Sequence, residues 1–175
     1  MHYPIKTSRL QIKPLGPQDL EGFVTYRQDP DVARFQSWEP TYSEQDAFEL
    51  IQSQSGVLIP KPGEWLQLGI HTLGSDELVG DLALHAVPES EKIFELGFTI
   101  SRMHQGKGFA KEAASALMSH ILKEKIAKRF IANTDSRNKP SIHVLRALGF
   151  KSDPERGWFE NFKNEEVFVE YYETN

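Results

Sequence analysis

The stretch Gln105-Gly106-Lys107-Gly108-Phe109-Ala110 lies between a strand-like run, residues 93–100, and a helix-like run, residues 111–123. Its two glycines leave the backbone free of side chains where the chain enters the helix. The first N–H groups of a helix have no acceptor within the helix, and the helix dipole adds partial positive charge there. Lys107 adds a full charge beside them. The sequence therefore predicts that this turn holds a phosphate or diphosphate group.

Two common phosphate-binding motifs do not fit the turn. A Walker loop continues with a hydroxyl side chain for a magnesium ion, whereas here Lys107-Gly108 is followed by Phe109. A dinucleotide-binding turn needs a third small residue where this chain has Lys111, and it follows the first strand of its βαβ unit. The pattern that fits is Gln-x-x-Gly-x-Ala, from Gln105 to Ala110. For so short a motif alone, a glycine-rich helix start without a ligand explains the letters equally well.

Composition limits the classes of function. The chain has 175 residues, of which 39% are hydrophobic and 26% charged, so one domain, residues 1–175, can bury a sizeable core. Its net charge of −5 argues against sequence-independent nucleic-acid binding and is compatible with an amine substrate. No cysteine is present, which excludes disulfides and thiolate metal sites. Without an apolar run of spanning length or a signal peptide near Met1, we expect a cytoplasmic protein that binds no membrane.

The order of predicted elements indicates a single α+β domain without repeats or linkers. Residues 5–15 predict a strand, and 17–27, a short segment from 29 and 43–51 predict helices. From residue 65 the apolar period changes to two, which predicts strands at 65–73, 78–87 and 93–100 with turns at 74–77 and 88–91. A helix at 106–125, a strand at 129–133, a helix at 140–148 ended by Gly149, and strands near 150, 159–162 and 167–172 complete the chain.

This order, with a glycine turn after the third hairpin strand, resembles the GNAT N-acetyltransferase family over nearly the whole chain. The turn matches the family's Gln/Arg-x-x-Gly-x-Gly/Ala pattern, and Asn138, Ser141 and the Leu-Gly-Phe segment 148–150 match its downstream motif. Residues 95–98, Glu-Leu-Gly-Phe, and residues 7–10, Thr-Ser-Arg-Leu, resemble the branch that acetylates ribosomal-protein amino termini (the RimJ/RimL type).

The resemblance implies the acyl-CoA N-acyltransferase fold, a mixed, mostly antiparallel sheet that is flanked by helices and splayed at the cofactor site. It implies acetyl-CoA as cofactor, coenzyme A as product and no metal. The cofactor-binding residues that it implies are Phe98, Thr99, Ile100, Gln105, Gly106, Lys107, Gly108, Phe109, Ala110, Asn133, Asn138 and Ser141. Three of these have simpler alternatives: a solvated Lys107, a helix cap at Asn138 and polar pairing at the end of a strand for Asn133.

The implied reaction is attack of a neutral amine on the acetyl thioester. At pH 7, deprotonating a lysine-type amine costs about 4–5 kcal/mol, whereas a peptide α-amine costs only about 1 kcal/mol. We expect Glu95 to act as the base through a water molecule, with solvation or pairing to Arg102 or Lys92 as the alternative. Further candidates are His71, His85 and Asp81, for which polar packing is the simpler explanation, and His104, for which surface exposure is.

Many relatives protonate the leaving thiolate with a tyrosine, but the corresponding position here is Leu145. Ser141 resembles the serine that replaces it in the ribosomal-protein branch, and its alternative role is a bond to its own backbone. By analogy with relatives, Trp38, Glu39 and Tyr42, with Trp158 as a further candidate, line the acceptor side unless they belong to the core.

We therefore expect acetyl transfer to a primary amine, first of all a protein N-terminal α-amine. A small-molecule or aminoglycoside acceptor and a non-catalytic coenzyme A sensor stay as alternatives, as do a monomer and a homodimer.

Overall fold

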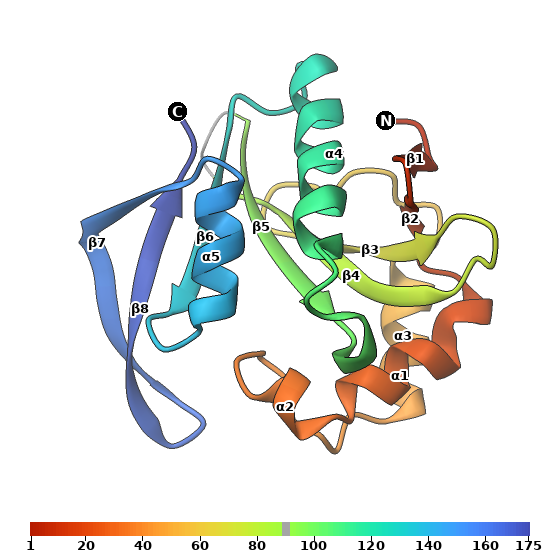
Figure 1. Ribbon diagram of the computed structural model, residues 1–175, viewed down its shortest axis with the longest axis horizontal. Coiled ribbons are helices and arrows are strands. Elements are labelled where there is room, and N and C mark those ends of the chain that lie inside the picture. The colour runs from red at the N-terminus through yellow and green to blue at the C-terminus, as the bar shows by residue number, and fades with distance from the viewer. Residues whose placement is uncertain (89–91) are drawn as a thin grey trace.

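The computed structural model describes residues 1–88 and 92–175, which form one mixed sheet with helices on both faces (Figure 1). The sheet has the strand order β1-β2-β3-β4-β5-β6-β8-β7 in these residues, and its pairs are antiparallel except for β5 with β6. The strands are β1 (Ile5–Lys6), β2 (Leu10–Pro14), β3 (Trp65–Thr72), β4 (Leu78–Ala86), β5 (Ile93–Ile100), β6 (Arg129–Asp135), β7 (Lys151–Phe162) and β8 (Glu165–Glu173). The helices are α1 (Leu20–Arg27), α2 (Pro30–Ala33), α3 (Glu44–Ser53), α4 (Phe109–Lys123) and α5 (Lys139–Ala147). The turn predicted at 88–91 lies outside the described residues beyond Pro88.

Local signals in the sequence set the ends of several helices. The Ser43 hydroxyl accepts the N–H of Asp46, whose carboxylate accepts the N–H of Ser43, and this predicted capping box starts α3. Asp29 caps α2 by accepting the N–H of Asp31. Gly149 follows α5 with φ of +90°, as expected of a residue that ends a helix.

Three predicted sets of boundaries were wrong. The separate strands predicted near 150 and at 159–162 are parts of one strand, β7, whose register against β8 shifts between Asp153 and Trp158. The strand predicted at 5–15 is a tight hairpin, because the chain reverses at Thr7 so that Ile5 pairs with Ile12. The Thr7 hydroxyl accepts the Leu10 N–H at 2.9 Å and stabilises the reversal. The helix predicted from residue 106 begins at Phe109, since the preceding glycines of the turn have positive φ and lie outside the helical region.

The sheet separates into two parts between β5 and β6. Their parallel pairing runs from Ile93 opposite Arg129 to Glu95 opposite Ile131 and then ends. Past Glu95, β5 stays paired with β4 as far as Ile100, while β6 continues beside β8. Figure 1 shows the two strands side by side at one end and far apart near α2. The predicted splay of the sheet is confirmed.

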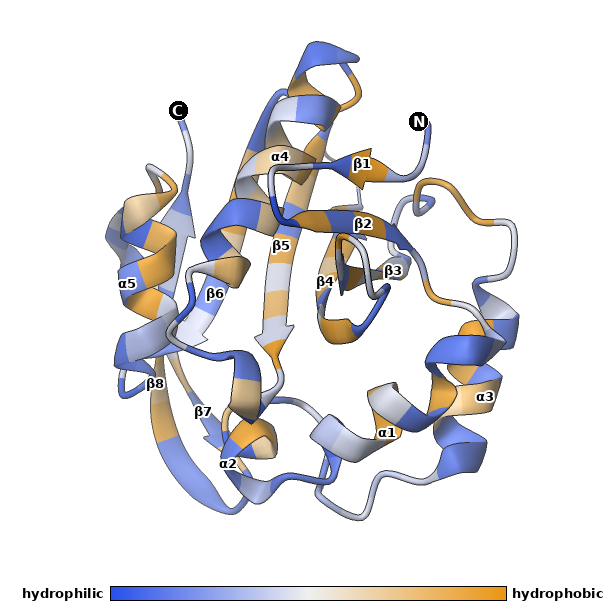
Figure 2. Cartoon of the chain, turned by 45° about the vertical axis from the view of Figure 1, so that its right-hand side comes forward, coloured by the Kyte–Doolittle hydropathy of each residue, from blue (hydrophilic) through white to orange (hydrophobic). Residues whose placement is uncertain are grey.

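Helices cover the two faces of the sheet from opposite sides. The apolar residues Ala113, Ala114, Leu117 and Ile121 of α4 pack into the main core with alternate residues of β3 to β5. Helices α1 and α3 pack over the other face around Phe23 and Ala47. In Figure 2 the amphipathic helices α3 and α5 show apolar and polar stretches that agree with their half-covered positions.

Gly80 allows β4 to lie close against the part of β5 that borders the splay. A Cβ there would lie 2.1 Å from the Thr99 carbonyl oxygen and 3.0 Å from the Ile100 Cα. We expect Gly80→Ala to lower the free energy of unfolding in urea by about 1–3 kcal/mol through overpacking. The control Gly22→Ala, whose Cβ would meet only Leu78 at 3.6 Å, should leave it unchanged or higher because alanine favours the helix. Equal stability of both variants would contradict this role.

Candidate active site

A cavity of about 1080 Å³ lies where β5 and β6 separate. Its walls come from segments far apart in the sequence. They are residues 95–100 of β5, the turn and first residues of α4, residues 132–135 of β6, one side of α5, residues 35–37 after α2, and side chains of β7 and β8. The predicted cofactor turn, the splayed strands and α5 thus surround one space.

The glycine turn has the geometry of an anion-binding loop. Gly106 and Gly108 have φ of +73° and +77°, a conformation that other residues rarely adopt. The first hydrogen bond of α4 runs from the Glu112 N–H to the Gly108 oxygen at 3.0 Å, so the amides of residues 109–111 precede the helix's own bonding. These residues line the cavity. The turn therefore fits a diphosphate group.

Two other members of the turn have structural bonds. The Gln105 side-chain nitrogen Nε2 donates to the Ile100 backbone oxygen at 3.0 Å and so joins the turn to the end of β5. Lys107 is exposed, and its carbonyl oxygen accepts a hydrogen bond of 3.0 Å from Arg9 Nη1. The structure thus shows a structural role for the Lys107 backbone, whereas a phosphate contact of its side chain stays a prediction.

Glu95 is the last residue of β5 that pairs with β6, and it lies in the cavity wall. Its Oε1 accepts the Asn133 side-chain N–H at 2.9 Å, and its Oε2 lies 3.4 Å from His85 Nδ1. The partners weighed for Glu95 from the sequence are bonded elsewhere: Lys92 donates to the Lys125 oxygen, and Arg102 pairs with Asp31. Both Glu95 oxygens are therefore oriented by side chains from the neighbouring strands.

Asn133 Oδ1 is buried and has no hydrogen-bond partner among residues 1–88 and 92–175. Asn133 lies on β6 past the last residue that pairs with β5, and it lines the cavity. Its amide group thus combines a structural bond to Glu95 with a free acceptor, so the polar-pairing alternative is observed and a cofactor contact stays a prediction.

Helix α5 presents Ser141 and Leu145 to the cavity, four residues apart on one side of the helix. Asn138 caps the helix, because its Oδ1 accepts the Ser141 N–H at 3.2 Å. The helix-cap alternative for Asn138 is therefore present in the structure. Leu145, at the position of the usual tyrosine, is only 1% exposed, so the cavity wall is apolar there.

Two of the three predicted acceptor residues, Trp38 and Tyr42, pack around Arg27, and the third contacts Lys163. The Trp38 ring lies 3.8 Å from the Arg27 guanidinium, and the Tyr42 ring lies 4.9 Å from it. Glu39 is exposed and lies 3.5 Å from Lys163. The cavity wall is instead made by the preceding residues 35–37. The sequence placed the correct loop at the cavity, and roles of these three residues in acceptor binding stay predictions.

Buried polar pairs account for most of the other titratable candidates. His71 Nε2 bonds Asp19 at 2.8 Å, with both side chains buried. Asp81 accepts the Tyr26 hydroxyl at 2.5 Å, and burial raises its pKa although Arg27 and Tyr26 act in the opposite direction. The polar-packing explanation is therefore confirmed for these two pairs. His85 contacts Glu95 as described, and His104 is half-buried in the cavity wall rather than exposed.

Lys163 was missed by the sequence reasoning and joins the β7–β8 hairpin to the chain around and after α2. From the β7–β8 hairpin its ammonium group donates to the Ala33 oxygen at 2.9 Å and the Trp38 oxygen at 2.7 Å. Lys163 and Asn164 both have positive φ, as in a two-residue hairpin turn. Such turns favour Asn-Gly pairs, so Lys-Asn was too weak a signal. Trp158, the further candidate, does line the cavity.

The comparisons with known proteins agree with this geometry. A profile of the acetyltransferase (GNAT) domain matches residues 9–151. The chain belongs to the GNAT family. The uncharacterized N-acetyltransferase p20 from Bacillus licheniformis is 26% identical to this chain over 147 residues, which cover 84% of this chain and 82% of p20.

Solved structures share the GNAT fold over the whole chain. The crystal structure of a GNAT-family acetyltransferase from Bacillus anthracis has a TM-score of 0.83 at 26% identity and covers 98% of this chain and 97% of that one. RimL, a ribosomal L7/L12 α-N-protein acetyltransferase solved with coenzyme A, has a TM-score of 0.81 at 18% identity, with coverage of 98% and 97%. This GNAT protein is thus an acetyl-CoA-dependent N-acetyltransferase with the predicted fold. In the described part of the chain, no helix combines the length and apolar character needed to cross a membrane.

Removing the Lys163 ammonium should loosen the contact between the β7–β8 hairpin and the loop after α2. We expect Lys163→Met to speed amide hydrogen exchange of residues 33–39 about tenfold, since the hydrogen bonds of this partly exposed charge are worth at least about 1.4 kcal/mol. Lys151→Met is the control, because Lys151 lies at the opposite end of β7 and its ammonium group bonds Asn175. Unchanged exchange in Lys163→Met would show that the bridge does not hold the loop.

Proposed function

We propose that this enzyme acetylates a protein or peptide N-terminal α-amine, with Glu95 accepting the amine proton through a water molecule. The observation that carries the proposal is the position of Glu95 at the point where β5 leaves β6. There its carboxylate borders the cavity and is held by Asn133 and His85. A base that is fixed by its neighbours needs no rearrangement when the proton moves.

The residues around the cavity are suited to hold acetyl-CoA, which supplies the acetyl thioester. Past Glu95, the edge of β5 at residues 98–100 no longer pairs with β6 and can bond an extended amide chain as an added strand would. The amides of the glycine turn, residues 105–110, would hold the diphosphate. Asn133 and Asn138 also line the cavity and would contact the arm that connects the thioester to the diphosphate.

Ser141 is our candidate for the proton donor to the departing sulfur. Its side chain is half-buried in the cavity wall, on the first turn of α5. A hydroxyl group can both donate and accept a hydrogen bond, whereas Leu145 at the usual acid position can do neither.

The lower pKa of an α-amine favours it over a lysine-type amine as the acceptor substrate. At pH 7 a peptide α-amine loses its proton at a cost of about 1 kcal/mol, within the reach of one carboxylate, whereas a lysine-type amine costs about 4–5 kcal/mol. RimL, whose description gives it an α-amine substrate, shares the fold. Small-molecule amines, aminoglycosides among them, and a non-catalytic coenzyme A-binding role are the alternatives.

A panel of acceptors with detection of the released thiol tests the proposal. Peptides with a free amino terminus should give a higher kcat/KM than the same peptides blocked at the terminus and carrying one lysine. Preference for polyamines or aminoglycosides over all peptides would support the small-molecule alternative. Binding of coenzyme A with no thiol release from any amine would support the sensor.

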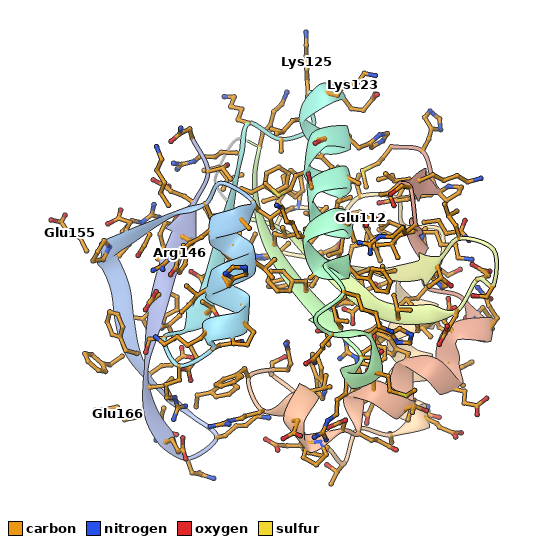
Figure 3. The ribbon with its side chains drawn as sticks, viewed as in Figure 1. Glu112, Lys123, Lys125, Arg146, Glu155 and Glu166 are labelled. Atoms are coloured by element: carbon orange, nitrogen blue, oxygen red, sulfur yellow. The ribbon has the colours of Figure 1, made fainter. Side chains whose placement is uncertain are left out.

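Replacing Glu95 should slow the enzyme in a way that depends on pH. We expect Glu95→Gln, which can keep the bond from Asn133, to lower kcat about 10²- to 10⁴-fold at pH 7. The deficit should shrink as pH rises toward the pKa of the acceptor amine, because the amine then loses its proton to solvent. Glu155→Gln, on an exposed part of β7 far from the cavity (Figure 3), is the control. A deficit that is small or constant with pH would exclude Glu95 as the base.

A further inference from the structure

Arg9 lies just before β2 and contacts the residues on both sides of Gly108. Its Nη1 donates to the Lys107 oxygen at 3.0 Å, and its guanidinium lies 4.8 Å from the centre of the Phe109 ring. Its Nε donates to Glu112 Oε2 at 2.7 Å. Arg9 thus joins the N-terminal hairpin, the glycine turn and the first turn of α4, where Figure 3 labels Glu112.

Glu112 holds Arg9 in a defined orientation although Arg9 is 49% exposed. The second carboxylate oxygen of Glu112 accepts the Thr7 hydroxyl at 2.5 Å and the Arg9 backbone N–H at 3.2 Å. Burial alone would raise the pKa of Glu112, but the bonds from Thr7 and Arg9 lower it, so the carboxylate stays ionised at neutral pH. An arginine held by a carboxylate on one side can direct its remaining N–H groups at one acceptor.

Arg9 donates its hydrogen bond to the Lys107 carbonyl group. The orientation of that carbonyl group fixes the direction of the Gly108 N–H. In a trans peptide the C=O of one residue and the N–H of the following residue point in opposite directions. The bond from Arg9 to the Lys107 oxygen therefore turns the Gly108 N–H away from Arg9. A Cβ on Gly108 would lie 3.6 Å from Arg9 Nη2. Gly108 also lines the cavity.

We propose that Arg9 is a positioning residue for the diphosphate of coenzyme A, which it serves by aiming the Gly108 N–H into the cavity rather than by touching the cofactor. The proposal rests on the proposed function, in which the glycine turn holds this diphosphate. It predicts a defect that depends on the diphosphate and on nothing else in the cofactor.

The test measures Kd for coenzyme A and its shorter analogues, and kcat/KM for acetyl donors with and without the diphosphate, in Arg9→Met and Arg9→Lys. For Arg9→Met we expect Kd for coenzyme A and for 3′-dephospho-coenzyme A to rise about tenfold alike, which corresponds to about 1.4 kcal/mol. The rate constant kcat/KM with acetylpantetheine, which has no diphosphate, should be unchanged, and kcat with saturating acetyl-CoA should be retained. Arg9→Lys should recover little, since lysine cannot reproduce the two-sided contact.

Arg156→Met is the matched control, since Arg156 is 48% exposed, pairs with Glu173 and stacks on Tyr171, away from the turn. It should bind coenzyme A as the wild type does. If Arg9→Met fails to fold, Glu112→Gln, which weakens the hold on Arg9, should give the same selective defect in smaller degree.

Three results would overturn the proposal. Equal loss with acetylpantetheine and acetyl-CoA would mean a general disturbance, and a loss for coenzyme A but not for its 3′-dephospho form would mean direct contact with the 3′-phosphate. Arg9→Met behaving like Arg156→Met would remove any role. Failure of the wild type to bind coenzyme A would instead refute the proposed function.

Discussion

The separation of β5 from β6 after Glu95 is the constraint on which the rest of the site depends. Backbone N–H and C=O groups along the separated edges need partners, and within a sheet those partners would be the neighbouring strand. Helix α4 packs against β5, and α5 packs against β6. The two helices therefore hold open a gap whose edges are ready to bond an extended ligand, and both helices start at that gap.

Cations that bond backbone carbonyl oxygens hold both ends of the cavity. Arg9 reaches the Lys107 oxygen over a separation of 98 residues, and Lys163 reaches the Ala33 oxygen over 130. A carbonyl that accepts from a charged donor has its whole peptide plane fixed, so each contact sets the course of the chain as well as joining two segments. Arg9 acts on the glycine turn, and Lys163 acts on the chain around and after α2. The same kind of contact, a side-chain cation that donates to a backbone carbonyl oxygen, thus holds two segments with little regular structure.

The sequence was most informative where chemistry and backbone geometry coincide at one short stretch. The glycines of the turn, the cap at Ser43 and the end of α5 at Gly149 were predicted, because positive φ and capping side chains leave local traces in the letters. The pocket position of Glu95 followed from the family's strand order, whereas its partners Asn133 and His85 did not, since cross-strand neighbours depend on register.

The predictions that were wrong, or that missed the cavity, concern contacts over long distances. The single hydroxyl of Thr7 is a weak local sign of a reversal within residues 5–15, and its second partner, Glu112, lies more than a hundred residues away, so the sequence pattern indicated one strand instead of the hairpin. Trp38 was expected beside the acceptor by analogy with relatives, in which the first helices and the late hairpin flank the acceptor side. Its position instead follows from the buried Arg27, which needs aromatic faces around its charge.

Arg27 also connects the loop that contains Trp38 to the sheet. Its guanidinium lies 3.7 Å from Asp81 on β4 and 3.8 Å from the Trp38 ring, so a buried ionic contact anchors the residue that follows 35–37 of the cavity wall. If the two charges of this pair moved apart, each would be buried without its partner, and the cost in free energy restricts how far the loop can shift. Side chains at 35–37 can vary without disturbing that anchor.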